Sequence, residues 1–344
     1  MAHWKHQLAT AARRARDRLG FLQVRGTATR VIERTVPRPL LAGERFSMVQ
    51  PHRNQSGGWT VGVEREGTPV AFLKMASSGS GGRRLRREAE MLRGLASESA
   101  LEWLQPYFPR VMAAGDDRGK VYLLLSRLEG EPALRHLHGA ASRDRLLTEA
   151  GALLDRVRRA TGADVVLGEA ELRALIDLPA AAAISLFGAA EERPAVARLE
   201  AVRKEVRGRM AGVALTTSLI HGDFWPSNLL VDPGTGSISG IVDWESAERH
   251  SLAIHDAMHL VLYTRKLVAR SHLGWEVRRA MDGAPWSDTE RGILGAATPP
   301  DLELRPLLLL YWLRQIAVNL DRQPDQTRRK AWRRDNVEVV LEWL

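Results

Sequence analysis

A hairpin predicted within residues 219–246, LIHGDFWPSNLLVDPGTGSISGIVDWES, constrains the fold of this chain more than any other stretch. Two apolar, strand-like runs lie on either side of a Pro-Gly turn, and polar residues stand at their ends. These polar residues are Asp223, Asn228 and Asp243. Because a hairpin returns to its starting end, we expect Asn228 and Asp243 to lie close together. The sequence therefore predicts that the three residues share one site.

Composition limits the classes of function that remain open. The chain has 344 residues, 44% hydrophobic and 26% charged, as in an ordinary soluble globular protein. It has no cysteine, which excludes disulfides, thiolate catalysis and a cysteine-ligated zinc site. No run of 18 apolar residues suggests a membrane span, and the first residues lack the apolar core of a secretory signal. A cytoplasmic location is the default expectation.

The net charge of +9 is concentrated near the N-terminus, where residues 1–60 hold eleven Lys and Arg against three acids. Apolar residues recur there at helical spacing from Trp4 to Leu22, with arginines on the other face. Residues 1–30 could therefore contact an anionic membrane or another polyanion. The alternative is a helix that packs on its own protein, since any surface helix is amphipathic. We expect no nucleic-acid partner, and the sequence does not specify an oligomeric state.

The order of predicted elements divides the chain into three parts. We expect residues 1–43 to form a basic helical extension and residues 44–128 to form a strand-rich lobe with one helix. Residues 129–344 form a mostly helical lobe that the hairpin interrupts. The predicted strands are 45–50, 59–63, 70–75 and 121–126, and the clearest helices are 143–160, 194–211, 252–270 and 304–320.

Transfer of a phosphoryl group needs a carboxylate for the attacking hydroxyl, hard oxygen ligands for the metal and a cation for the phosphates. Asp223 and Asn228 lie five residues apart, which is the separation of the acid and the metal-binding amide in a kinase catalytic loop. Lys74 ends the apolar run VAFLK, and Glu88 on the next predicted helix could pair with it. Glu90 competes for that role, but helix phase favours Glu88. A loop with Ser56, Gly57 and Gly58 could cover the nucleotide with backbone N–H groups.

With these residues in view, the chain resembles the aminoglycoside phosphotransferase and choline kinase family over roughly residues 45–320. The strongest part is HGDxxxxN followed by IVDWE, in residues 219–260. The resemblance implies an α+β, protein-kinase-like fold with two lobes. The N-lobe would be small, mainly antiparallel β with one helix, and nucleotide-binding, whereas the larger C-lobe would be mostly α-helical.

The resemblance also implies a role for each residue of the motifs. Asp223 would be the catalytic base, and Asn228 and Asp243 would bind Mg²⁺. Lys74 and Glu88 would hold the phosphates of ATP or GTP, the phosphate donor. The resemblance also implies that adenine contacts the backbone near Ser126, Arg127 and Leu128. Asp256 would support the catalytic loop. His221 is expected to pack and hydrogen-bond within that loop.

Several features leave alternatives open. The helix before the catalytic region reads LLDRVRRATG rather than ending in Leu-His, RHSLAIHD lacks a Gly-x-Pro element, and the loop PHRNQSGG has only two glycines. These departures bear on the acceptor class and on the conformation of the nucleotide loop. A kinase-like regulatory module without turnover is a separate alternative to a small-molecule kinase, and the presence of all the proposed catalytic side chains argues against it. His255 and His259 have the i, i+4 spacing of a metal site, but structural roles are favoured.

The acceptor class is only weakly indicated by the sequence. Residues 251–344 hold fourteen Lys and Arg against twelve acids, so no acidic excess favours a polycationic antibiotic. A sugar, an amino alcohol or a related metabolite remains open as the acceptor. Weak candidates for acceptor recognition in the helical region are Trp275, Trp286, Tyr311, Trp312 and Arg314.

Overall fold

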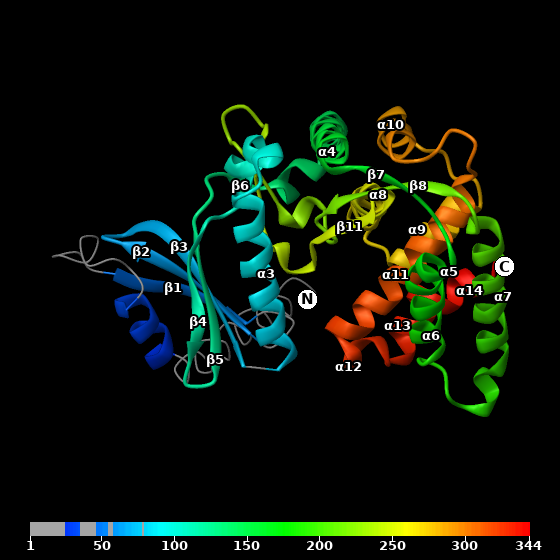
Figure 1. Ribbon diagram of the computed structural model, residues 1–344, viewed down its shortest axis with the longest axis horizontal. Coiled ribbons are helices and arrows are strands. Elements are labelled where there is room, and N and C mark those ends of the chain that lie inside the picture. The colour runs from blue at the N-terminus through cyan, green and yellow to red at the C-terminus, as the bar shows by residue number, and fades with distance from the viewer. Residues whose placement is uncertain (1–24, 35–45, 54–57, 78) are drawn as a thin grey trace, which may run out of the picture. The chain divides into compact units, whose positions relative to one another are not determined.

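The computed structural model describes residues 25–34, 46–53, 58–77 and 79–344 (Figure 1). The chain forms two compact units, of which the first is Met1–Glu129 with Gly240–Ser246 and the second is Gly130–Ser239 with Ala247–Leu344. The predicted boundaries after residues 43 and 128 stay predictions. The amphipathic pattern from Trp4 to Leu22 lies outside the described residues.

The first unit is built on one five-stranded antiparallel sheet in the order β1-β2-β3-β5-β4 (Figure 1). Two-residue turns join β2 to β3 and β4 to β5. The turn residues Glu66, Gly67, Arg118 and Gly119 all have positive φ, as a type I′ hairpin turn requires. The strands are β1 Phe46–Arg53, β2 Trp59–Arg65, β3 Thr68–Ser77, β4 Val111–Asp117 and β5 Lys120–Ser126, and the 3₁₀ segment η1 is Ser99–Tyr107.

The two faces of this sheet are covered by different helices. Leu73 and Met75 of β3 belong to an apolar cluster with Val31 of the helix over residues 25–34. Because side chains alternate along a strand, Lys74 points to the opposite face. Helix α3 (Ser80–Ala96) covers that face, and its buried stripe includes Leu85. The alternation of side chains along β3 thus directs Lys74 toward α3.

Gly82 sets how closely α3 approaches the sheet. A Cβ atom at this position would lie 2.8 Å from the Ser77 carbonyl oxygen and 2.8 Å from Cγ2 of Val121. Both distances are shorter than normal van der Waals contact, and one of the two atoms belongs to the backbone. The close packing of α3 on β3 and β5 therefore requires glycine here.

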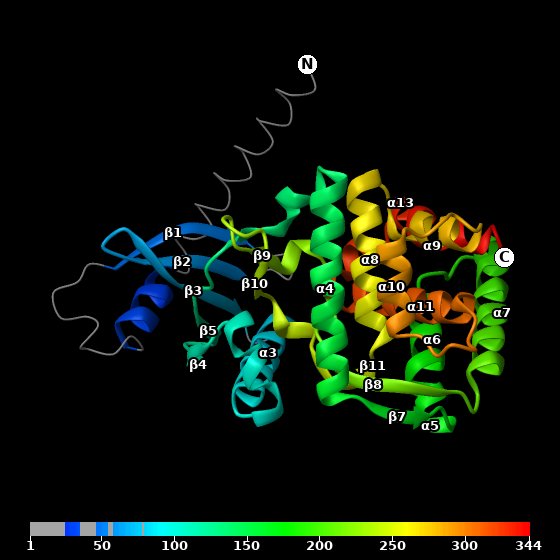
Figure 2. The same ribbon diagram turned by 90° about the horizontal axis from the view of Figure 1, so that it is seen from above.

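The second unit is mostly helical, and two of its helices form the centre. Helix α8 (Ile254–Ala269) is buried from Ile254 to Thr264, and α11 (Leu304–Arg322) is buried from Pro306 to Ile316. A helix that is apolar on nearly every side must lie inside the core. Helices α4 (Ala140–Thr161) and α8 run side by side (Figure 2).

Other helices surround the central helices α8 and α11, and short helical turns complete the second unit. The α-helices are α5 Glu169–Leu172, α6 Leu178–Ile184, α7 Arg193–Met210, α9 Leu273–Met281, α10 Asp288–Ala296, α12 Pro324–Thr327, α13 Lys330–Arg333 and α14 Val339–Leu341. The short turns are η2 Ala133–Leu137, η4 Ala190–Glu192, η5 Pro226–Asn228, and the π-helical turns Arg173–Asp177 and Arg334–Glu338.

Two small sheets frame the segment that was predicted as a polar hairpin. In one sheet, β8 (Ala214–Ile220) lies between β7 (Ala163–Val166) and β11 (Glu248–Leu252), antiparallel to both. In the other, β9 (Leu229–Val231) lies between β6 (Glu131–Pro132) and β10 (Ile238–Ile241). The catalytic-loop candidate, residues 221–228, connects β8 to β9.

The expected fold class is confirmed: the protein is α+β, with an antiparallel sheet in one part and a mostly helical second part. The predicted strands and long helices correspond to β1, β2, β3, β5, β9, β10, α4, α7, α8 and α11. Two details differ. Strand β3 continues three residues beyond Lys74, and β4 (Val111–Asp117) was not predicted from the sequence.

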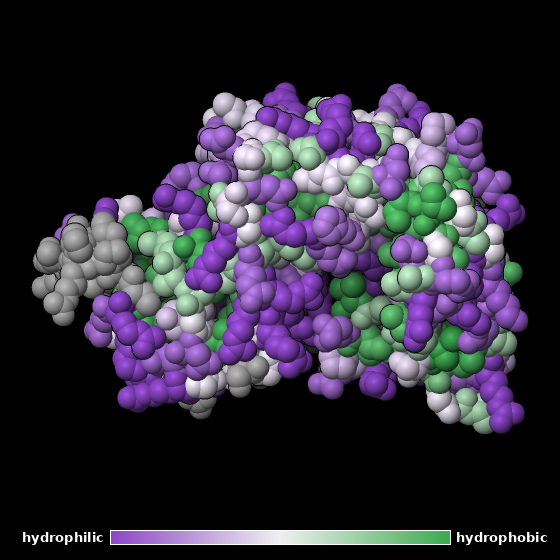
Figure 3. Space-filling view, in the orientation of Figure 1, coloured by the Kyte–Doolittle hydropathy of each residue, from purple (hydrophilic) through white to green (hydrophobic). Residues whose placement is uncertain are grey.

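The surface agrees with the composition. Much of the face drawn in Figure 3 is hydrophilic, with apolar areas between the polar ones. Among the helices that the structure describes, none has both the length and the apolar character needed to cross a bilayer.

We expect Gly82→Ala to destabilise the protein by about 1–3 kcal/mol, because the added Cβ overpacks the contact of α3 with β3 and β5. Gly208→Ala is the matched control, since Gly208 lies in the last turn of α7 and a Cβ there meets nothing within 4 Å. That change should leave stability unchanged or raise it by up to about 1 kcal/mol. Urea unfolding of both variants measures the difference, and equal stabilities would contradict the packing argument.

Candidate active site

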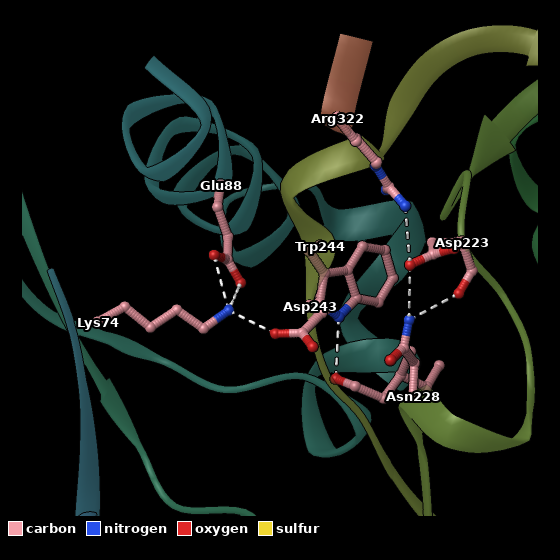
Figure 4. A network of polar contacts seen from close by, with 8 residues as sticks. Lys74, Glu88, Asp223, Asn228, Asp243, Trp244 and Arg322 are labelled. Atoms are coloured by element: carbon pink, nitrogen blue, oxygen red, sulfur yellow. Dashed lines mark hydrogen bonds and ion pairs between the residues drawn. The ribbon is translucent and has the colours of Figure 1, made fainter. Parts of the chain in front are cut away.

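A buried lysine lies at the centre of the polar network in the first unit. Lys74 Nζ lies 2.7 Å from Oε1 and 2.9 Å from Oε2 of Glu88. It also lies 2.6 Å from Oδ1 of Asp243 (Figure 4). Glu88 is fully buried on α3, whereas Glu90 is exposed. The structure thus places Glu88 on Lys74, as helix phase predicted, while the role of the pair in phosphate binding stays a prediction.

Burial and charge act against each other in this network. Burial alone would lower the pKa of Lys74, but the negative charges and hydrogen bonds of Asp243 and Glu88 outweigh it and raise the pKa. Burial raises the pKa of Glu88, and the positive charge of Lys74 opposes that change. The ammonium group therefore stays protonated and fixed between two acceptors.

The backbone around Asp243 holds its carboxylate toward Lys74. Asp243 follows β10 and has a φ of 65°, in the left-handed region that aspartate tolerates better than most residues. The next residue, Trp244, is buried, donates its indole N–H to the Ile241 carbonyl at 2.9 Å and packs edge-on against Phe108. The Asp243 side chain is half exposed, so its carboxylate can meet both Lys74 and a ligand.

In the second unit, Asp256 braces the loop that carries Asp223. Its carboxylate accepts the backbone N–H of His221 at 2.6 Å and that of Gly222 at 2.9 Å. Burial raises the pKa of Asp256 to about 7, although these two bonds and the charge of Arg314 act in the opposite direction. Gly222 has a φ of 74°, a conformation that glycine adopts without strain. His221 is buried, with its ring edge-on to Phe224.

Three side chains contact the Asp223 carboxylate from different parts of the second unit. Asn228 Nδ2 donates to Asp223 Oδ2 at 3.1 Å and to its carbonyl oxygen at 2.9 Å (Figure 4). His259 Nε2, on α8, lies 3.1 Å from Oδ1. Arg322, the last residue of α11, places NH1 3.2 Å from Oδ2. Helices α8 and α11 therefore both end up supporting one acid.

These contacts determine the charge state of Asp223. Burial would raise the pKa of Asp223, but the contact with His259 and the positive charge of Arg322 outweigh it and hold the pKa well below its usual range. Burial lowers the pKa of His259, so the imidazole is neutral near pH 7. His259 Nδ1 lies 2.9 Å from the Tyr311 hydroxyl, which fixes the ring. Asp223 is thus an ionised carboxylate in a fixed orientation.

The predicted magnesium ligands have suitable chemistry. Because Asn228 uses Nδ2 to bind Asp223, its side-chain oxygen is the end left for a cation. Asp243 offers a partly exposed carboxylate, and an amide oxygen with a carboxylate is a donor set that fits Mg²⁺. Asn228 and Asp243 belong to different units, so their joint binding of one ion stays a prediction. No cluster of three or more metal-binding side chains occurs among the described residues.

The predicted nucleotide contacts are only partly described. Ser56 and Gly57 lie outside the described residues, and Gly58 is buried next to β2. At the end of β5, the Ser126 N–H donates to Arg110 O at 2.9 Å, and the N–H of the next residue, Arg127, donates to Val70 O at 3.1 Å. These two N–H groups are already used, so an adenine contact here would fall to carbonyl groups or to Leu128.

Sequence reasoning missed the two side chains that contact Asp223 from the helices. From the sequence, His259 is considered only together with His255, as a metal pair or, preferably, in a structural role, and Arg322 is not singled out. Of the weak acceptor candidates, Tyr311 and Trp312 are completely buried, and Tyr311 contacts His259 instead of facing solvent. In the sequence, His259 lies one helical turn after Asp256. Helix periodicity places the two residues on one face of α8 but does not show that His259 contacts Asp223.

Comparison with solved structures finds proteins that this chain resembles. A proposed fructosamine-3-kinase from Haemophilus somnus is 14% identical in sequence, with a TM-score of 0.52. The match covers 89% of this chain and 96% of that protein. A GDP complex of an aminoglycoside 2′-phosphotransferase has 15% identity and a TM-score of 0.51, covering 92% and 96%. An aminoglycoside phosphotransferase from Streptomyces rimosus has 19% identity and a TM-score of 0.49, covering 85% and 98%. No curated protein matches the chain.

The first two structures support the fold alone, because their sequence identities are low. The sequence itself is more specific, since residues 55–286 match the phosphotransferase enzyme family and contain the HGDxxxxN and IVDWE motifs. This match covers more than half of the chain. The protein therefore belongs to the phosphotransferase enzyme family.

Proposed function

We propose that this phosphotransferase is a Mg²⁺-dependent kinase that transfers the γ-phosphate of ATP or GTP to a hydroxyl group of a small molecule. The observation that carries the proposal is the environment of Asp223. Its carboxylate is ionised and held by Asn228, His259 and Arg322. A fixed carboxylate of this kind is what an attacking hydroxyl needs.

On the acceptor side, Asp223 accepts a hydrogen bond from the hydroxyl and orients its oxygen toward the γ-phosphorus. The bond from this oxygen to phosphorus forms while the bond from phosphorus to the β,γ-bridging oxygen breaks, and the nucleoside diphosphate leaves. The hydroxyl proton passes to Asp223. Because the pKa of Asp223 is low, we expect this proton to move late, after most of the P–O bond has formed.

On the donor side, Lys74 holds the α- and β-phosphates, and Glu88 holds Lys74 in place. Asn228 and Asp243 would provide oxygen ligands for Mg²⁺, and the bound cation would supply positive charge to offset the charge that develops on the phosphates. The loop with Ser56, Gly57 and Gly58 covers the nucleotide, and the segment Ser126–Leu128 contacts its base. His221 and Asp256 support the catalytic loop.

The proposal is tested by a phosphate-transfer screen with ATP and GTP in parallel against neutral, anionic and cationic hydroxyl compounds. We expect Mg²⁺-dependent formation of a phosphorylated product from at least one acceptor class. Nucleotide binding without transfer to any compound would instead favour a regulatory module without turnover.

We expect Asp223→Asn to reduce kcat roughly 100-fold to 10,000-fold, because an amide cannot accept the hydroxyl proton. The KM for ATP should change little, since Asp223 is proposed to act on the acceptor. Steady-state kinetics with the best acceptor measure both values. Asp301→Asn, at an exposed position, is the control and should leave kcat unchanged; a full kcat in the Asp223 variant would refute the base assignment.

Asp243→Asn should weaken nucleotide binding much more in Mg²⁺ than in EDTA, because the change removes one negative charge from the proposed metal site as well as one charged partner of Lys74. Calorimetric titration with ATP in Mg²⁺ and in EDTA separates the two conditions. We expect the wild-type protein to bind much more tightly in Mg²⁺ and the variant to lose most of this difference. An unchanged difference would show that Asp243 is not a ligand.

Glu88→Gln and Glu90→Gln form a matched pair on α3. We expect Glu88→Gln to raise the KM for ATP about tenfold, equivalent to about 1.4 kcal/mol, because Lys74 loses a charged partner that fixes its position. Glu90 is exposed, so its variant should behave like the wild type. Equal kinetics for the two variants would count against the role of the Lys74–Glu88 pair.

A further inference from the structure

Two basic side chains act on the carboxylate that is proposed to meet the acceptor: Arg322 contacts it, and Lys266 lies within electrostatic range of it. Arg322 NH1 lies 3.2 Å from Asp223 Oδ2. Lys266, in the last turn of α8, places its ammonium group 4.3 Å from the centre of the Tyr263 ring. Both basic side chains are partly exposed, so an incoming ligand can reach them. The acid therefore lies in a positively charged setting.

These groups belong to two helix faces that converge on Asp223. On α8, His259, Tyr263 and Lys266 follow at spacings of four and three residues and so share one face. On α11, Asn319 hydrogen-bonds to the Tyr263 side chain, and Arg322 follows one turn later. Because these faces are joined, the cations of Lys266 and Arg322 belong to the same surface as Asp223.

The other groups on this surface do not offset the positive charge. Burial lowers the pKa of His259, and burial raises the pKa of Tyr263 to about 12, so both are neutral near pH 7. Asp321 in the last turn of α11 and Asp325 in α12 are exposed, where water screens their charges. Burial lowers the pKa of Lys266, and the negative charge of Asp223 opposes that change. With both bases protonated, Asp223 contributes one negative charge against the two positive charges of Arg322 and Lys266.

We propose that the acceptor of this enzyme is a hydroxyl compound with no positive charge near the reacting hydroxyl, either neutral or anionic. This inference rests on the proposed role of Asp223. A hydroxyl that binds Asp223 Oδ2 takes a place next to the Arg322 guanidinium, so an ammonium group on a neighbouring carbon comes within a few ångströms of it. Arg322 and Lys266 then repel cationic acceptors and attract a carboxylate or phosphate on the acceptor.

The test compares acceptors that differ mainly in charge. One trio is glucosamine, glucose and glucuronate, and a second is serinol, glycerol and glycerate. We expect the wild-type kcat/KM to be at least tenfold higher for the neutral or anionic member of each trio that reacts. A cationic member that reacts fastest would overturn the inference but leave the proposed kinase function intact. No transfer to any member, or to any compound of the wider screen, would contradict both.

Variants link this preference to the two basic residues. Arg322→Gln and Lys266→Gln should each reduce the ratio of neutral to cationic kcat/KM several-fold, whereas Arg322→Lys should preserve it. Because both acceptors are measured on the same preparation, partial unfolding cancels in the ratio. Arg209→Gln removes the same charge from an exposed position on α7 and should not change the ratio. An unchanged ratio in both Gln variants would refute the assignment.

Discussion

The hydrogen bonds from the backbone of His221 and Gly222 to the buried carboxylate of Asp256 are the contacts on which the second unit depends. They tie a loop, which has few backbone contacts of its own, to the central helix α8. An unpaired backbone N–H in a buried place costs roughly 1–3 kcal/mol, so the loop has little freedom to leave this position. Because Asp223 follows Gly222 directly, the same two bonds fix the origin of the proposed catalytic side chain. The helical core thus sets the position of the acid.

In the first unit, a candidate functional side chain is held in place by ion pairs rather than by backbone hydrogen bonds. A lysine directed at the inner face of α3 would be unstable if it were buried alone. Glu88 on α3 and Asp243 after β10 supply two acceptors, so the ammonium group is fixed from two sides. The close approach of α3 at Gly82 and the packing of Trp244 against Phe108 hold those acceptors in place. Removing any of these supports would leave a charge buried without its full set of partners.

Sequence patterns predicted what depends on local spacing. The separation of Asp223 and Asn228, the lysine after four apolar residues and the helix phase that favours Glu88 are all local features of the chain. Strand β4, VMAAGDD, was missed because alanine, glycine and aspartate have low strand propensity. The contacts of His259 and Arg322 with Asp223 span 36 and 99 residues. Such contacts arise from the packing of α8 and α11, and no short sequence motif predicts them.

The two networks use similar residues but carry opposite net charges. In the first unit, one lysine meets two carboxylates, which leaves one negative charge in excess and favours a divalent cation. In the second unit, one carboxylate contacts an arginine and lies within electrostatic range of a lysine, which leaves one positive charge in excess. Since His259 and Tyr263 are neutral, they add no charge that would reverse this difference. A carboxylate with a low pKa is a weak base in the ground state, so the main role proposed for Asp223 is to orient the acceptor hydroxyl. The same cations that keep it ionised also act on whatever molecule it orients.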